Sequence, residues 1–303
     1  MTHTIIFSFD RAIQLELLLQ SIERYDRQNT LKVSVLFAYS TNDHLKSYAA
    51  LQQKYPSVNW VAEERFKKRM VLPIFPAYWH NYYWWLKYSY SRVYSSHFRQ
   101  QVLDLIRNQS EETVMFLTDD SMFFRDFSIP DLALCKISEH PSIASFSLRH
   151  GKNIGGGNFV ELHDSLYWNI YDPQEHPEWS FPFSIDGHIY SKLFIERSFS
   201  KVWFKNPNTL EGNIACYVKE KKLLSTVYGN KESSLVGFEL NRVQTISNNN
   251  NLNISSNYLN TLFSNGYRMK IAFDPAKNSL FRPDKFKVDA WREDSTINII
   301  TVS

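Results

Sequence analysis

The sequence is poor in cysteine and close to neutral in charge. Its two cysteines, Cys135 and Cys216, are too few for a disulfide framework and have no metal-ligand spacing, which fits a reducing compartment. The formal net charge of +3 is too small for the strong basic face that nucleic-acid binding needs. These absences predict a cytoplasmic protein whose partners do not include nucleic acid.

Long hydrophobic runs are absent as well. No uncharged apolar stretch approaches the roughly 18 residues of a membrane-spanning helix, and residues 1–10 have neither the charged start nor the apolar core of a signal peptide. A basic segment at 65–70, followed by an aromatic run at 75–94, could dock on an anionic membrane. A packed aromatic helix with a solvated basic end is the alternative. The membrane association that we expect is therefore peripheral, at the inner face.

Apolar runs alternate with amphipathic segments through residues 1–125. The runs predict buried strands, at 4–9, 31–39, 58–63 and 112–117. Apolar residues at helical spacing predict helices, at 12–25, 42–55 (capped by Asn42 or Asp43) and 97–109. Strands that alternate with helices are typical of a parallel sheet with crossover helices. We predict one Rossmann-like α/β domain over 1–303, with a central, mostly parallel sheet flanked by helices.

The second half of the chain is less regular. Segments 142–150 and 159–171 predict further strands. The glycine-rich segment 151–159 lacks the pattern of a phosphate-binding loop, so we expect a mobile hairpin or flap there. Residues from Asp274 onward are polar and are expected to wrap the surface.

Polar residues follow the first and fourth predicted strands. In an open α/β sheet, ligands bind beyond the carboxyl ends of the strands. Asp119 and Asp120 could there hold Mg²⁺ or Mn²⁺ against a diphosphate, and their apolar flanks favour this over a plain turn because buried charge must be paired. Asp10 could accept hydrogen bonds from a base or ribose, and Arg11 could pair with a diphosphate. The alternative is that Ser8 or Asp10 simply caps the following helix.

Four further polar residues are candidates. Tyr39, after the second strand, could line a base pocket or begin a loop. Asp186, in an apolar frame, could be a general base, and His188 could be a metal ligand or an ordinary semi-buried histidine. Glu211 is a second base candidate, and its alternative role is a place in the first helical turn after a cap at Asn208.

These motifs together resemble glycosyltransferases of the A-type fold, in particular bacterial family-2-like enzymes that use nucleotide sugars. "FSFDRAIQLELLLQSI" is similar to their N-terminal opening, and "MFLTDDSMFF" to their aspartate-rich D-x-D motif. The later stretches "SLRHGKNI", "FPFSIDGHIYS", "NPNTLEG", "ELNRVQ" and "LNTLFSNGYRM" resemble the remainder of such a chain. The resemblance implies transfer of a sugar from a nucleoside-diphosphate sugar to a glycan or glycolipid, with inversion, in bacterial surface polysaccharide synthesis.

The resemblance also implies a division of labour along the chain. Residues 1–125 would bind the nucleotide sugar, with Ser8, Asp10 and Tyr39 lining the donor site. Residues 126–303 would bind the acceptor and supply the base, Asp186 or Glu211.

The metal site that the resemblance implies departs from the family pattern. A strict D-x-D motif needs a second acid at 118 or 121, where this chain has Thr118 and Ser121. Asp120 would be a ligand of Mn²⁺ or Mg²⁺, with Asp119 as a second ligand or a ribose contact. No histidine follows His188 in the sequence, so the third ligand would be His188 or would be absent. Arg11 or Arg149 would assist the diphosphate.

Two other functions stay open. A sugar-phosphate nucleotidyltransferase would share the fold and the acidic ligands. Such enzymes normally have a glycine-rich loop with arginine and lysine after the first strand, and the segment 8–14 of this chain has no glycine. A non-catalytic carbohydrate- or nucleotide-binding protein of the same fold would keep the pocket without turnover.

Overall fold

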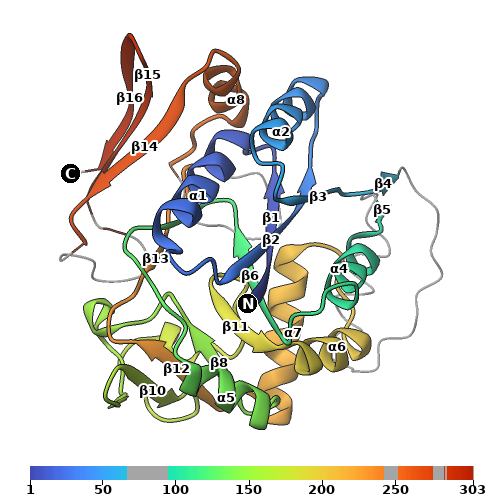
Figure 1. Cartoon of the computed structure of the whole chain (residues 1–303), viewed down its shortest axis with the longest axis vertical. Helices are drawn as coiled ribbons and strands as arrows, with labels where there is room; N and C mark the ends of the chain where they lie inside the picture. The colour runs from blue at the N-terminus through green and yellow to red at the C-terminus, as the bar shows by residue number, and fades with distance from the viewer. Residues whose placement is uncertain (67–94, 242–251, 276–282, 284, 303) are drawn as a thin grey trace.

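The computed structural model describes residues 1–66, 95–241, 252–275, 283 and 285–302. Within them, a nine-stranded sheet with the order β3-β2-β1-β6-β11-β8-β12-β10-β9 forms the centre (Figure 1). Its strands are β1 (Thr2–Phe9), β2 (Leu31–Ala38), β3 (Asn59–Ala62), β6 (Thr113–Thr118), β8 (Ala144–Ser147), β9 (Val160–Glu161), β10 (Ser165–Asn169), β11 (His188–Ser191) and β12 (Thr226–Asn230). The pairings give β10 and β11 the opposite direction to the rest, so the predicted mostly parallel sheet is confirmed.

Helices cover both faces of this sheet. The described helices are α1 (Ala12–Tyr25), α2 (Asn42–Lys54), α4 (Phe98–Arg107), α5 (Asp131–Glu139), α6 (Lys192–Lys201), α7 (Pro207–Lys221) and α8 (Ser256–Ser264). One hydrophobic cluster joins the sheet to α1, α2, α5 and α8, and a second joins it to α4, α6 and α7. Successive residues of β1 alternate between the two, with Ile6 in the first cluster and Ile5 and Phe7 in the second. A strand that is buried on both faces reads as a continuous apolar run, which is why β1 was recognisable in the sequence.

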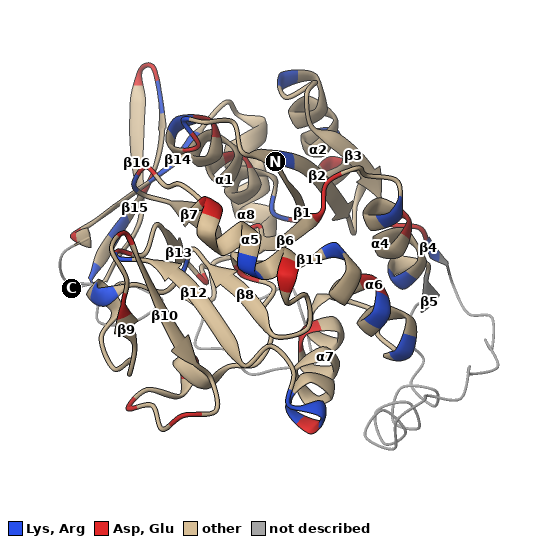
Figure 2. Cartoon of the chain, turned by 60° about the horizontal axis from the view of Figure 1, so that its bottom comes forward, with Lys and Arg blue, Asp and Glu red and all other residues tan. Residues whose placement is uncertain are grey.

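The predicted elements of residues 1–125 agree with the structure to within a few residues. The exception is the start of α2, where Thr41 is the cap, not Asn42 or Asp43. The Thr41 hydroxyl accepts a hydrogen bond from the backbone N–H of His44 at 3.3 Å. Basic residues lie in the last turns of α4, α6 and α7, where they complement the helix dipole (Figure 2).

The C-terminal residues form a sheet of their own, so the prediction of a tail that wraps the surface is wrong. β14 (Arg268–Phe273), β15 (Phe286–Arg292) and β16 (Ser295–Val302) pair antiparallel. Apolar residues alternate with polar ones along β15, so that Val288 and Ala290 are buried against the core. Arg268 anchors this sheet to α1 through an ion pair with Glu16 at 2.8 Å.

The glycine-rich segment is not a hairpin. It begins with a short 3-10 turn, Lys152–Ile154, and the Trp179 indole N–H then donates to the Gly155 carbonyl at 2.8 Å. A Cβ on Gly157 would come within 2.4 Å of the Trp179 ring, so only glycine allows this close approach.

Short strands complete the chain, and one predicted feature escapes comparison. β7 (Ser121–Phe123) pairs with β13 (Leu235–Gly237), and β4 (Arg65–Phe66) pairs with β5 (Ser95–Ser96). The aromatic run at 75–94 and most of the basic segment before it lie outside the described residues. None of the helices in the described part of the chain is long and apolar enough to cross a bilayer.

Candidate active site

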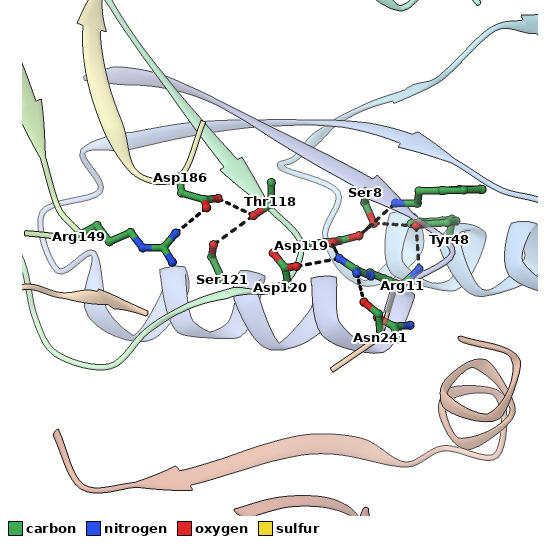
Figure 3. A network of polar contacts seen from close by, with 11 residues as sticks. Ser8, Arg11, Tyr48, Thr118, Asp119, Asp120, Ser121, Arg149, Asp186 and Asn241 are labelled. Atoms are coloured by element: carbon green, nitrogen blue, oxygen red, sulfur yellow. Dashed lines mark hydrogen bonds and ion pairs between the residues drawn. The ribbon is translucent and has the colours of Figure 1, made fainter. Parts of the chain in front are cut away.

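The carboxyl ends of β1 and β6 meet at one edge of the sheet. The two strands are parallel neighbours, with Phe7 opposite Thr118. The residues that follow them are therefore brought together although they are more than a hundred positions apart in sequence (Figure 3). The prediction that Ser8, Arg11 and the two aspartates share this edge is confirmed.

Asp119 is buried and fully engaged. One carboxylate oxygen accepts from the Ser8 hydroxyl at 2.8 Å and from the Phe9 N–H at 3.1 Å, and the other accepts from Arg11 Nη1 at 2.9 Å. Ser8 also shares a hydrogen bond of 2.7 Å with the Tyr48 hydroxyl. Burial raises the pKa of Asp119 to about 6, and the guanidinium of Arg11 opposes that rise.

One guanidinium holds both aspartates. Arg11 Nη1 also donates to Asp120 at 2.9 Å, and Nη2 donates to the backbone carbonyl of Asn241. Burial alone would lower the pKa of Arg11, but the charges of Asp119 and Asp120 outweigh burial and raise it. The side chain of Asp120 is 18% exposed, against 4% for Asp119, so Asp120 is the one that faces outward.

Asp10 and Tyr39 lie nearby but do not join this network. Asp10 adopts the left-handed backbone conformation (φ 57°), and its carboxylate accepts from the Ser40 N–H at 2.8 Å. It therefore links the end of β1 to the loop after β2. It does not cap α1, whose cap position is Arg11 with no side-chain hydrogen bond. The Tyr39 ring is 37% exposed and packs against Phe37.

A second carboxylate network adjoins the first. One oxygen of Asp186 accepts from the Thr118 hydroxyl at 2.6 Å, and the other accepts from Arg149 Nη1 at 2.5 Å. The chain turns sharply after Asp186 at Gly187, whose φ of 74° favours glycine. Because Thr118 directly precedes Asp119, the two networks lie side by side along the end of β6 (Figure 3).

Glu211 approaches the second network from α7. It accepts from the Ile185 N–H at 3.0 Å, and burial together with the negative charge of Asp186 raises its pKa to about 7. The cap of this helix is Asn206, which forms a capping box with Thr209, so the predicted cap at Asn208 is wrong. Glu211 thus lies in the second turn of α7, beyond the reach of the capping interactions.

His188 does not join the aspartates. Its ring lies 5.4 Å from that of His150, and burial lowers its pKa to about 4. Within the described residues, no group of three acidic, histidine or cysteine side chains is arranged to share a metal ion. The implied ligand set of Asp119, Asp120 and His188 is therefore not assembled there.

The donors at the aspartates do not fit a divalent cation held by both of them. Mg²⁺ and Mn²⁺ need carboxylate oxygens that can face the ion. Both oxygens of Asp119 already accept hydrogen bonds, and in the described part of the chain only one oxygen of Asp120 is left without a partner. The guanidinium of Arg11 lies between the two carboxylates. Arg149 is bound to Asp186 in the second network instead.

Two hollows were compared with the positions of the candidate residues, and neither is a substrate-sized cleft lined by them. A hollow of about 10 Å³ lies beside Asp119 and Asp120, which is room for one water molecule. A hollow of about 620 Å³ lies at the opposite edge, among Met1, Glu111 and the residues of α5 and α6 nearby, and it contains none of the predicted site residues. The chemistry of the carboxylate networks is therefore the better guide to the active site than volume.

Residues of the networks that were missed in the sequence include Tyr48, Thr118 as a hydrogen-bond donor, and Asn241. Tyr48 is one of several apolar positions of α2, and its spacing carries no sign of a polar contact. Thr118 could have been suspected, because it is the last residue of a strand that ends at the aspartates.

Comparison with known proteins gives one similarity in sequence. No protein-family model matches the chain. The chain is 25% identical over 211 residues to the bifunctional glycosyltransferase pgtA of Dictyostelium discoideum, a match that covers 61% of this chain and 23% of that protein. The chain thus spans less than a quarter of that relative. The resemblance to glycosyltransferases is confirmed by this match.

Solved structures with a partly similar course of the chain include two that hold nucleotide sugars. S. aureus TarS 1–349 in complex with UDP-GlcNAc is 14% identical with a TM-score of 0.42, over 78% of this chain and 57% of that one. The mannosyltransferase PcManGT from Pyrobaculum calidifontis, in complex with GDP-Man and Mn²⁺, is 14% identical with a TM-score of 0.32, over 64% of this chain and 46% of that one.

Proposed function

We propose that the chain is a glycosyltransferase that moves a sugar from a nucleoside-diphosphate sugar to a hydroxyl of a glycan or glycolipid. The observation that carries the proposal is the pair of carboxylate networks joined through Thr118 and Asp119 at the carboxyl edge of the sheet. The similarity to a glycosyltransferase over 61% of the chain supports it.

In this proposal the two networks serve the two substrates. Residues 1–125, with Ser8, Arg11 and the aspartate pair, take the nucleotide sugar. Residues 126–303, with Asp186, supply the acceptor half. The whole chain acts as one domain, because strands from both halves share one sheet.

Asp186 is the proposed base. Its side chain is 26% exposed, so an acceptor hydroxyl can reach it, and Thr118 and Arg149 fix its orientation. As the acceptor oxygen bonds to the anomeric carbon, its proton passes to Asp186 and the bond from that carbon to the diphosphate breaks. Attack from the face opposite the diphosphate inverts the anomeric centre. Arg149 is placed to offset negative charge that develops nearby.

Glu211 remains the second candidate for the base. Its pKa of about 7 would let it accept a proton at neutral pH, and one of its carboxylate oxygens accepts a hydrogen bond from the Ile185 N–H. The setting that we propose is bacterial surface polysaccharide synthesis in the cytoplasm, at the inner face of the membrane. The basic segment at 65–70 supports the membrane part of this proposal.

Calorimetric titration with UDP, GDP, CDP and dTDP tests the donor. We expect one of them to bind, and the matching nucleotide sugar to be turned over with acceptor. Asp186→Asn should keep nucleotide affinity and lose at least about a hundredfold in kcat. Asp126→Asn, an exposed carboxylate outside both networks, is the control and should change neither. If no nucleotide binds the proposal is wrong, and binding without turnover in the wild type would favour the carbohydrate-binding alternative.

A further inference from the structure

The aspartate pair already has a cation. Arg11 Nη1 lies 2.9 Å from an oxygen of each carboxylate, which is where an ion shared by the two would have to bind. A guanidinium is always protonated and can donate to two carboxylates at once. One unit of negative charge is left on the pair, and one oxygen of Asp120 accepts no hydrogen bond from the described residues.

Arg11 is not free to swing away. Its side chain is 9% exposed, and Nη2 is bound to the backbone carbonyl of Asn241. Removing Arg11 would leave Asp119 buried without its charged partner, and an uncompensated buried charge is costly. The Arg11 clamp, by which we mean Arg11 with Asp119 and Asp120, is therefore part of the folded core.

The surroundings of the clamp suit a hydroxyl-bearing ligand better than a metal ion. Asn241 is 3% exposed as a whole residue, and neither the nitrogen nor the oxygen of its buried side-chain amide has a partner among the described residues. An amide can donate to and accept from a hydroxyl, and the remaining oxygen of Asp120 can accept from one. A divalent ion bound to that oxygen would instead lie close to the guanidinium and be repelled by it.

We propose that Arg11 takes the place of the divalent cation in this chain, so that the donor site binds its nucleotide without a metal ion. Asp119 is then a positioning residue that orients Arg11, and Asp120 with Asn241 contacts hydroxyl groups of the donor. The proposal rests on the proposed function for the identity of the donor. The part of the proposal that concerns the cation does not depend on the proposed function, because Mn²⁺ can be titrated against the protein alone.

Electron paramagnetic resonance of Mn²⁺ tests whether the donor site binds a divalent cation. With wild-type protein alone we expect no bound Mn²⁺. With each of the four nucleoside diphosphates added, we expect no more bound Mn²⁺ than the same nucleotide binds without protein. Calorimetry should give nucleotide affinities that agree within about threefold between Mn²⁺ and EDTA. Stoichiometric Mn²⁺ binding, or a gain of about tenfold or more in nucleotide affinity with Mn²⁺ that Asp120→Asn abolishes, would overturn the proposal.

When Arg11 is replaced by a neutral residue, we expect the protein to gain affinity for Mn²⁺. Arg11→Gln should gain at least about tenfold in Mn²⁺ affinity, because two carboxylates are left with no cation between them. Arg27→Gln is the matched control, since it removes an arginine from an exposed pair with Asp126 and should gain nothing. Absence of a gain in folded Arg11→Gln would count against the proposal, and the wild-type measurement decides it if that variant does not fold. If no nucleotide binds and no Mn²⁺ binds, the donor assignment fails while the role of Arg11 stands.

Discussion

Glu211 should make the stability of the protein depend on pH near neutrality. Its carboxyl lies partly buried on α7 beside Asp186, and burial is the larger cause of its raised pKa. The charge of Asp186 adds to the rise, whereas the Ile185 N–H, Ser184 and Arg149 oppose it. In the unfolded chain the same group titrates near 4.5.

The direction in which stability changes with pH follows from the number of protons that the folded and unfolded states bind. Between pH 4.5 and about 7 the folded protein binds a proton at Glu211 that the unfolded chain does not. The free energy of unfolding therefore falls as pH rises through this window. At about 1.4 kcal/mol for each unit of pKa, the loss amounts to about 3.5 kcal/mol at most.

Glu211→Gln tests this reasoning. The amide oxygen of Gln can still accept from the Ile185 N–H but never becomes charged. We expect the variant to be more stable than the wild type by under about 1 kcal/mol at about pH 5 and by up to about 3 kcal/mol at about pH 8. Urea unfolding at both pH values measures the difference, with Glu232→Gln, a more exposed carboxylate, as the control. A Glu211→Gln effect that is equal at the two pH values would refute the account.

Two further pairs of substitutions have predicted effects on the stability of the fold. Asp119→Ala should cost about 3 kcal/mol in urea unfolding, because it breaks a buried pair, whereas Asp126→Ala at the exposed pair should cost under about 1 kcal/mol. An Asp119→Ala variant that is more stable than the wild type would instead indicate relief of repulsion between metal-ligating carboxylates. Gly187→Ala should cost about 2 kcal/mol in thermal unfolding, since φ is 74° and the Cβ would come 2.3 Å from Leu235. Gly212→Ala, in open space on α7, should stabilise by about 0.5–1 kcal/mol, and equal effects of the two would contradict the strain at Gly187.

Part of the candidate active site could be predicted from the sequence, because the end of a strand is marked by neighbouring residues. An apolar run that stops at Asp119 marks the end of β6, and the rule that ligands bind at carboxyl ends places Asp119 beside Ser8 and Arg11. The hydrogen bonds and ion pairs within the site could not be predicted in this way. The ion pairs of Arg11 with the two aspartates and the hydrogen bond of Asp10 with the Ser40 N–H were not predicted, because each joins segments that are far apart in the sequence.

The second half shows where local patterns fail. β15 and β16 were expected to be a surface tail, because the segment from Asp274 onward was judged by its polar composition and the alternation of apolar and polar residues along β15 was overlooked. The true cap of α7, Asn206, was missed because asparagines at 206 and 208 both fit a cap in sequence. Only the hydrogen bond from the Thr209 N–H distinguishes the two.

The sequence by itself determined four strands (β1, β2, β3 and β6), three helices (α1, α2 and α4) and the edge of the sheet that carries the aspartates, because apolar periodicity and strand ends are properties of neighbouring residues. The short strands β4, β5 and β7 were not predicted. The tertiary structure alone decided that Asp186 meets Thr118, 68 positions away. β11 inserts antiparallel between β6 and β8, so the residues just before it lie against the end of β6. Strand order of this kind depends on how distant segments pack, and no local pattern of residues encodes it.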